Sequence, residues 1–274
     1  MELNEYLNND HFSDLENLKE KYLGNAIFPH IVLKDFIKKE LLDDVLNEFP
    51  DLSKIDSRIE YENSREIKLA SKGSSDIQPA ATKLISFLNS DIFLNYLNSI
   101  TDIEETLISD PYLSGAGYHE VKSGGVLKVH VDFNKHPTMN LDRRLNLLLY
   151  LNKDWEDDWG GCLELYDKNN LNLPLVSVKP DFNTCVIFST TSFTYHGHPD
   201  ALNCPEDKSR KSIALYYFST GRPASEFAGD HSTLFVNTKG EKFKTMGSLM
   251  TLIMDFTPPI LLRNAKRLRR KFLK

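Results

Sequence analysis

The chain has 274 residues, of which 41% are hydrophobic and 26% charged, and its formal net charge is −6 at pH 7. These values are typical of a globular protein with one large domain or two small ones and a sizeable core. The negative charge argues against a surface built for nucleic acid, so we expect no specific nucleic-acid partner. Three cysteines without C-x-x-C spacing argue against a disulfide framework and a zinc knuckle.

The two ends of the sequence bear on its cellular setting. The start, MELNEYLNNDHF, has neither the basic nor the apolar region of a secretory signal. The longest apolar stretch, LMTLIMDFTPPILL, is broken by Asp255 and two prolines and is too short to span a bilayer. We therefore expect a cytoplasmic protein in a reducing environment.

Helical patterns dominate the first hundred residues. Residues 12–23 predict a short helix, with Ser13 and Glu16 in a capping-box pattern. Residues 35–49 start on an acidic residue and carry apolar side chains at helical spacing until a proline follows. Residues 80–100 repeat apolar side chains at that spacing, which predicts one or two helices.

Two other segments of this region do not show helical spacing of apolar residues. Residues 25–33, NAIFPHIVL, predict a strand, and Pro29 favours a place at the edge of a sheet. Residues 51–75 are polar and predict loops with isolated strand-like pieces.

From Pro111 onward short β-branched and aromatic runs alternate with turn residues. About seven strands at this spacing indicate a sandwich or a barrel. Because helices precede the strands, we expect an α+β, mainly β fold in which helices cover one face of the β-unit. The runs are SGAGYHEVKSGG, VLKVHVDF, RRLNLLLYLN, GGCLELYD, PLVSVKP, NTCVIFST and RKSIALYYFS.

Three regions are expected along the chain. Residues 1–105 form an N-terminal region of helices and strands that packs on a β-rich core at 106–225, and residues 226–274 form a C-terminal extension. Seven of its last fourteen residues are Lys or Arg and none is acidic. The preferred interpretation is a solvated basic helix whose leucines pack on the body, and the alternative is a tail that contacts an anionic surface.

The run VLKVHVDFN, residues 126–134, carries two metal-binding side chains on an apolar strand. Alternate side chains of a strand share a face, so Lys128, His130 and Asp132 lie together opposite a row of apolar residues. Taken alone, H-x-D is weak evidence, because a half-buried histidine paired with the aspartate explains it equally well.

The segment TYHGHPD offers a third ligand, because it follows the apolar strand NTCVIFST and opens into a Gly/Pro turn. His130 and Asp132 with His196 would place two imidazoles and one carboxylate on one side of a metal. Such a set leaves coordination positions open and suits non-haem Fe(II). His198 competes for the same role, and turn chemistry alone is the alternative for both histidines.

Arg210 lies fourteen residues after His196 and opens a strand. A guanidinium in this position can bind a carboxylate through two parallel hydrogen bonds, which a lysine cannot do. In the strand LNLLLYLN, Tyr150 shares a face with Asn146 and can add a hydrogen bond to the same carboxylate. A metal and a carboxylate-binding arginine together predict a small acid co-substrate between them.

These residues resemble the Fe(II)- and 2-oxoglutarate-dependent dioxygenases, and most closely their prolyl-4-hydroxylase-like branch. The resemblance rests on the order of H-x-D, the distal His and the Arg, and on the stretch RRLNLLLYLNKDWEDDWGGCLELYD. It covers roughly residues 110–220, and it implies a double-stranded β-helix, or jelly roll, with the metal at its open mouth.

Residue by residue, the resemblance implies that His130, Asp132 and His196 bind Fe(II), with the spacing to Arg210 favouring His196 over His198. It implies that Arg210 binds the distal carboxylate of 2-oxoglutarate. Tyr150 would assist Arg210. Tyr118 would line the co-substrate pocket, because it matches a position that does so in relatives.

The implied reaction couples decarboxylation of 2-oxoglutarate by O2, giving succinate and CO2, to hydroxylation of an unactivated C–H bond. Ascorbate is implied as a reductant that rescues oxidised iron. Relatives that halogenate lack the carboxylate ligand, so Asp132 favours hydroxylation.

The resemblance favours a prolyl residue of a protein or peptide as the substrate, and a small biosynthetic intermediate is the alternative. Arg143 matches a position near the substrate in relatives, although strand alternation places Arg144 on the face of Tyr150 unless a bulge intervenes. Two solvated arginines are the competing interpretation. The loop 133–142 is expected to cover the substrate.

Two other classes of function remain in view. A catalytically silent jelly-roll module that only binds partners is disfavoured, because a scaffold has no reason to assemble both the three metal-binding residues and Arg210. A zinc hydrolase is disfavoured because the sequence has no H-E-x-x-H arrangement.

Overall fold

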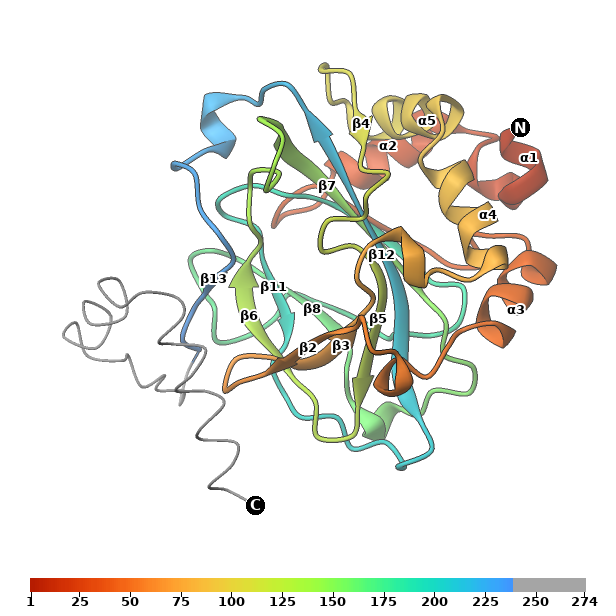
Figure 1. Cartoon of the computed structure of the whole chain (residues 1–274). Helices are drawn as coiled ribbons and strands as arrows, with labels where there is room; N and C mark the ends of the chain where they lie inside the picture. Colours follow the sequence, from red (N-terminus) through yellow and green to blue (C-terminus); the bar gives the residue numbers. More distant parts are fainter. Residues whose placement is uncertain (239–274) are drawn as a thin grey trace. The chain divides into compact units, whose positions relative to one another are not determined.

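Two antiparallel β-sheets face each other in the computed structural model, which describes residues 1–238 (Figure 1). The larger sheet has the strand order β1-β10-β7-β12-β5-β3-β2, with β4 paired to β12, and the smaller has the order β13-β6-β11-β8-β9. The strands are β1 (His30–Leu33), β2 (Ile59–Glu62), β3 (Ile67–Ala70), β4 (Ile108–Ser109), β5 (Gly117–Lys122), β6 (Leu127–Val131), β7 (Asp142–Tyr150), β8 (Leu163–Tyr166), β9 (Val176–Val178), β10 (Cys185–Ser189), β11 (Tyr195–His198), β12 (Ser209–Ser219) and β13 (Leu234–Phe235).

The larger sheet is buried on both faces, and β7 shows why its sequence is nearly continuously apolar. Leu145, Leu147 and Leu149 point to one face and belong to the main hydrophobic core with the helices. Tyr150 points to the other face and packs in a second cluster with residues of the smaller sheet, including Leu165. A strand covered on both sides needs apolar residues at consecutive positions rather than at alternate ones.

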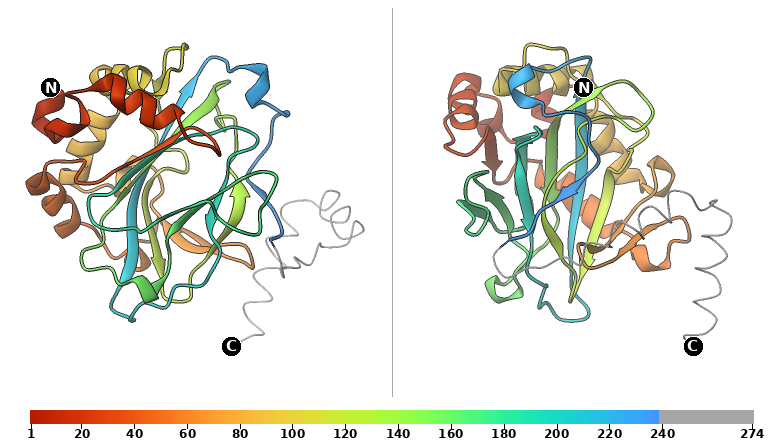
Figure 2. Two further views of the ribbon diagram at one scale, coloured as in Figure 1. Left: turned by 180° about the vertical axis from the view of Figure 1, so that it is seen from behind. Right: turned by 90° about the vertical axis from the view of Figure 1, so that its left-hand side faces the viewer.

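The helices of the first hundred residues lie beside the larger sheet and away from β6 and β11, as the view from behind in Figure 2 shows. They are α1 (Leu3–Tyr6), α2 (Leu15–Leu23), α3 (Lys39–Asn47), α4 (Pro79–Leu88) and α5 (Asp91–Thr101). The buried side chains of α2 to α5 belong to the main core. Most of the apolar stabilisation of this face therefore comes from helix-on-sheet packing.

Local sequence signals explain where these helices begin and end. The predicted segment 80–100 forms two helices, because Ser90 caps α5 by accepting a hydrogen bond from the Phe93 N–H at 3.4 Å. Asp102 ends α5 in the left-handed conformation. The capping residue of α2 is Asp14, which accepts from the Asn17 N–H, so the predicted cap at Ser13 is wrong by one residue.

Strands from the N-terminal region complete the larger sheet. β1 lies at the edge of that sheet beside β10, as the proline before it predicts. Residues expected to be loop-rich contain β2 and β3, which pair with each other, and β3 continues onto β5. Pairing between distant segments, rather than a local pattern, defines these strands.

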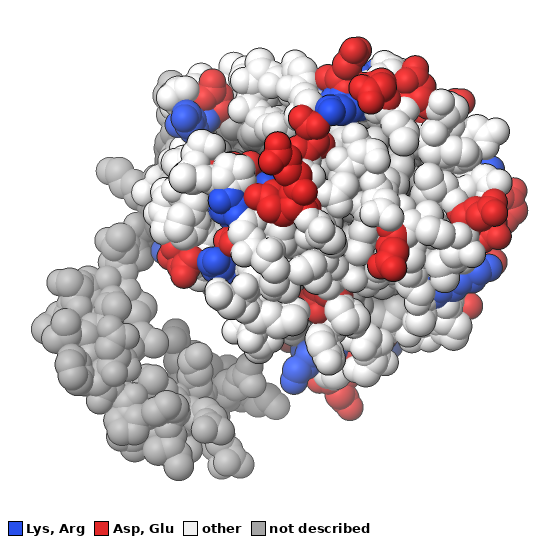
Figure 3. All heavy atoms as spheres, turned by 90° about the horizontal axis from the view of Figure 1, so that it is seen from above, with Lys and Arg blue, Asp and Glu red and all other residues white. Residues whose placement is uncertain are grey.

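The prediction of a mainly β fold with flanking helices, consistent with a jelly roll, is confirmed. Among the described residues, no helix is both long and apolar enough to cross a membrane. Acidic and basic side chains are interspersed on the face seen from above in Figure 3. The predicted basic tail lies outside the described residues.

Leu147 offers a direct test of the helix-on-sheet core. Its side chain is fully buried in that core, between the strand partners Ile187 and Leu215. We expect Leu147→Ala to lower the free energy of unfolding by about 2–5 kcal/mol, because the cavity it leaves closes only partly. Urea denaturation followed by circular dichroism measures the change.

The matched control is Leu173→Ala, since Leu173 is 61% exposed. We expect this change to alter the free energy of unfolding by no more than about 0.5 kcal/mol. Equal effects of the two substitutions would contradict the assignment of the core.

Candidate metal and co-substrate site

Strand pairing brings two distant histidines together. In the register of β6 and β11, His130 lies opposite His196, and their ring centroids are 4.3 Å apart. Asp132 follows β6 directly, and its carboxylate lies 3.4 Å from Nε2 of His130 and 3.3 Å from Nε2 of His196. One ligand atom from each residue lies within 4.8 Å of the other two. The structure therefore assembles the three residues that the sequence predicts as metal ligands.

Backbone carbonyls orient both imidazoles. Nδ1 of His130 lies 2.8 Å from the Lys128 carbonyl oxygen, and Nδ1 of His196 lies 3.3 Å from that of Thr194. Because a carbonyl only accepts hydrogen bonds, Nδ1 is the protonated nitrogen in each neutral ring. The lone pairs on Nε2 then face the carboxylate, as in metal sites whose histidines donate their other N–H to the protein.

Polar neighbours hold the Asp132 carboxylate in place. Its Oδ2 accepts hydrogen bonds from Asn146 Nδ2 at 2.6 Å and from Arg143 Nη2 at 3.1 Å. Burial opposes ionisation, but the charge of Arg143 holds the pKa of Asp132 well below its usual range. Burial lowers the pKa of His130, and the neighbouring His196 adds to this effect. The group is thus a carboxylate beside a neutral imidazole, the forms that bind a metal ion.

A β-bulge brings Arg143 to this site. The register of β7 and β12 shifts between Tyr217 and Phe218, which lie opposite Leu145 and Arg143. Arg144 is the extra residue of β7 at this bulge. Before it, the side chains of the strand point to the opposite faces from those that strict alternation predicts. The guanidinium of Arg143 then contacts Asp132. The competing interpretation of two solvated arginines is wrong, because Arg143 and Arg144 are only 1% and 3% exposed.

Arg210 lies at the start of β12 with its guanidinium beside Tyr150. Its Nη2 donates to the Tyr150 hydroxyl at 3.1 Å and its Nε to the Gly161 carbonyl at 2.7 Å. Nη1 makes no hydrogen bond within residues 1–238. Burial raises the pKa of Tyr150 although Arg210 opposes this, so the phenol keeps a proton that it can donate. The two side chains therefore offer donors that one carboxylate could accept, and this role remains a prediction.

The W/GG signature of the sequence supports this arginine. Gly161 has a φ of +74° and its carbonyl accepts from Arg210. A Cβ at this glycine would lie 3.1 Å from Arg210 Cδ. The indole N–H of Trp155 donates to the Gly160 carbonyl at 2.9 Å, which fixes the turn. The signature thus positions the guanidinium of Arg210.

The placement of Tyr118 in the co-substrate pocket needs correction. Tyr118 lies opposite Ile213 and its ring packs on Phe49, with centroids 4.5 Å apart, in the main core. Its neighbour His119 lies opposite Ser212, which in turn lies opposite Tyr150. Side chains of opposed residues share a face, so His119, and not Tyr118, faces the pocket.

His119 and His198 are polar residues of this interior that the sequence analysis did not assign to co-substrate binding. Burial lowers the pKa of His119 to about 3, with the charge of Lys68 as the next cause. Burial and then Arg210 hold the pKa of His198 well below its usual range. His198 does not belong to the cluster of metal-binding residues, which agrees with the preference for His196. Strand alternation from His196 could have placed His198 in this interior, whereas no local pattern of the sequence selects His119.

The donor set fits Fe(II) and a 2-oxo diacid. Two imidazole nitrogens and one carboxylate on one side of a metal ion would leave open coordination positions for further ligands, as in non-haem Fe(II) sites. Arg210 and Tyr150, on the facing sheet, fit the far carboxylate of such an acid. The roles of these residues in binding remain predictions.

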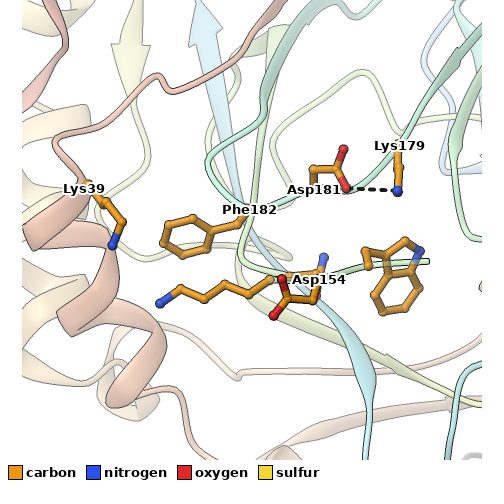
Figure 4. A pocket seen from close by; sticks show the side chains of 8 residues that line it. Lys39, Asp154, Lys179, Asp181 and Phe182 are labelled. Carbon is orange, nitrogen blue, oxygen red and sulfur yellow. Dashed lines mark ion pairs between the residues drawn. The ribbon is translucent and has the colours of Figure 1, made fainter. Parts of the chain in front are cut away.

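A separate hollow of about 530 Å³ lies near the YLNKDW segment and includes none of the predicted site residues (Figure 4). Lys39 and Lys153 both pair with Asp43, and Lys179 pairs with Asp181. The charged residues that line this hollow are thus largely neutralised by ion pairs within the protein. We do not assign the predicted chemistry to this hollow.

A protein-family comparison agrees with the geometry. Residues 116–218 match the model of the 2OG-Fe(II) oxygenase superfamily. This range contains the three converging residues, Tyr150 and Arg210. The prediction of the superfamily is therefore confirmed.

Two curated relatives are prolyl hydroxylases. The chain is 34% identical over 90 residues to prolyl 3-hydroxylase OGFOD1 of Mus musculus, covering 31% of this chain and 16% of the relative. It is 26% identical over 202 residues to prolyl 3-hydroxylase OGFOD1 of Xenopus laevis, covering 71% and 36%. The chain thus spans 16% of the Mus musculus relative and 36% of the Xenopus laevis relative.

Solved structures of prolyl hydroxylases share the fold. A Pseudomonas putida prolyl-4-hydroxylase matches with a TM-score of 0.52 at 14% identity, covering 75% of this chain and all of that chain. A prolyl hydroxylase from Trichoplax adhaerens, solved with a hypoxia-inducible-factor peptide fragment, matches with a TM-score of 0.54 at 19% identity, covering 77% and 94%. At these identities the likeness establishes the fold.

Asn146 provides a test of how the carboxylate is held. We expect Asn146→Ala to weaken Mn(II) binding about 10- to 100-fold, because Asp132 loses a hydrogen bond that orients it while the net charge stays the same. Isothermal titration calorimetry measures the affinity. The control is Asn95→Ala, at an exposed position of α5. Equal Mn(II) affinities of the two variants would show that this hydrogen bond does not support the site.

Proposed function

Because residues 116–218 match the model of the 2OG-Fe(II) oxygenase superfamily and the chain is similar to prolyl hydroxylases, we propose that it is an Fe(II)- and 2-oxoglutarate-dependent dioxygenase. One observation carries the proposal: two Nε2 lone pairs and a carboxylate converge opposite a buried arginine that retains an unbonded Nη1. The curated relatives extend well beyond the matched segments, so the activity is inferred from this site.

Each side chain has a distinct part in the proposed reaction. His130, Asp132 and His196 would hold Fe(II), and the bound iron and 2-oxoglutarate would supply the chemistry that activates O2. Arg210 and Tyr150 bind the distal carboxylate and so fix the direction in which the co-substrate lies. The surrounding apolar side chains, such as Leu165 and Phe188, keep water from the interior. Ascorbate is proposed as the reductant that keeps the iron in its ferrous form.

We propose a prolyl residue of a protein or peptide as the substrate, since the named relatives are prolyl hydroxylases. Arg143 and the aromatic rings of Phe133 and Tyr216 lie beside Asp132, where a substrate would approach the iron. The loop 133–142 is proposed to cover that substrate. Its start is held in place, because the buried Asn134 donates to the Gly229 carbonyl at 2.8 Å. The cytoplasmic location remains a prediction.

The first test of the proposal is optical. Under anaerobic conditions, Fe(II) and 2-oxoglutarate added to the chain should produce a weak visible charge-transfer band, because the 2-oxo acid chelates the metal. Asp132→Ala removes one of the three ligands, so we expect the band to disappear. Asp154→Ala, at a position in the separate hollow, is the control that should retain it. No band in the unchanged chain would rule out the proposed cofactor chemistry.

The second test concerns the substrate class. We expect proline-containing peptides to raise succinate release well above the rate without substrate, because a bound substrate couples decarboxylation to hydroxylation. Mass spectrometry should find one added oxygen on proline. Peptides with alanine in place of proline are the control. If free amino acids or other small metabolites stimulate succinate release and peptides do not, the prolyl assignment is wrong while the dioxygenase assignment stands.

A further inference from the structure

His198 is a buried histidine whose ring has no hydrogen-bond partner among residues 1–238. It lies at the end of β11, two residues from His196, and is 4% exposed. Neither Nδ1 nor Nε2 has a hydrogen-bond partner in the part of the chain that the structure describes. A buried polar group without a partner lowers stability, so such groups call for a functional explanation.

The metal site does not provide that explanation. The cluster that can hold a metal consists of His130, Asp132 and His196, and each of these residues offers a ligand atom to it. His198 lies opposite Leu127 rather than His130, because the register of β6 and β11 shifts between His196 and His198. Its ring is therefore placed farther along the strand pair than the three ligands.

His198 instead lies near the arginine of the co-substrate site. It lines a cavity of about 130 Å³ together with Gly161 and Cys162. The Gly161 carbonyl accepts from Arg210 Nε, so this cavity borders the residues that hold the guanidinium. Arg210 is also the foremost charge acting on the His198 ring.

We propose that His198 is a third residue that binds the distal carboxylate of the 2-oxo diacid, beside Arg210 and Tyr150. An imidazole offers at least one N–H donor in either protonation state, and a carboxylate accepts about four hydrogen bonds. The arginine and the phenol fill only part of that capacity, and the carboxylate would give the ring the partner that the protein lacks. This role rests on the proposed function and makes His198 a specificity residue for a diacid co-substrate.

The test compares two ligands on the full chain loaded with Mn(II) under anaerobic conditions. One is 2-oxoglutarate, and the other is 2-oxopentanoate, which has the same metal-binding end and no distal carboxylate. His198→Val removes the donor and keeps a residue suited to a strand. We expect it to weaken 2-oxoglutarate binding about 10- to 100-fold, the range for a hydrogen bond to a charged group, and to leave 2-oxopentanoate binding unchanged. Calorimetry measures both affinities.

Three further variants make the result specific. His198→Asn and His198→Gln place an amide donor near Nδ1 and Nε2 respectively, so one of them should recover part of the 2-oxoglutarate affinity and preserve the comparison if valine disturbs folding. His30→Val is the control, since His30 is another buried histidine in a strand, with Nδ1 2.9 Å from the Phe28 carbonyl oxygen and no place in the site. It should leave both affinities unchanged.

The outcomes separate this inference from the proposed function. If His198→Val leaves 2-oxoglutarate affinity unchanged, or weakens both ligands equally, the role of His198 is overturned while the dioxygenase assignment stands. If the unchanged chain binds Mn(II) but no 2-oxoglutarate, the proposed function fails, and the inference fails with it.

Discussion

The mutual approach of three hydrogen-bond acceptors is the interaction on which the rest of the site depends. Nε2 of His130 and of His196 lie 3.4 and 3.3 Å from the Asp132 carboxylate, and both rings direct their N–H groups to backbone carbonyls instead. Lone pairs and a negative charge at such distances repel one another unless a cation lies between them. The geometry of β6 and β11 thus favours a metal ion between the two imidazoles and the carboxylate, in addition to the donors that Arg143 and Asn146 give to the carboxylate.

Each of the two sheets supplies different groups to the site. The smaller sheet supplies the imidazoles through a single cross-strand pair, and the larger sheet supplies the groups that orient the carboxylate and receive the acid. On β7 the same alternation that sends Leu147 to the helices sends Asn146 and Tyr150 to the interior. The core that fixes the larger sheet therefore also fixes the side chains that face the metal-binding residues.

Local patterns in the sequence were sufficient to predict site residues where a strand has one polar and one apolar face. His130 and Asp132 stood out on an apolar strand, and Arg210 and Tyr150 followed from alternation on strands with clear ends. Alternation was uninformative on β5, because residues on both of its faces are buried, and the resemblance then selected Tyr118 instead of His119. The bulge that turns Arg143 toward Asp132 depends on the pairing of β7 with β12, which no local pattern encodes.

Long-range pairing also explains the other differences. β2 and β3 became strands because they continue a sheet built by residues far along the chain, although their own sequence is polar. The unpartnered ring of His198 could be recognised only after neighbouring elements had been placed around it.

Pulsed electron paramagnetic resonance of the Mn(II)-loaded chain tests the central claim most directly, because it detects imidazole nitrogens bound to the metal. The account predicts modulation from two histidine nitrogens, reduced to one in His130→Ala and in His196→Ala and unchanged in His198→Val. Nitrogen modulation that is absent, or that survives both of the first two substitutions, would contradict the convergence of these residues on one metal ion.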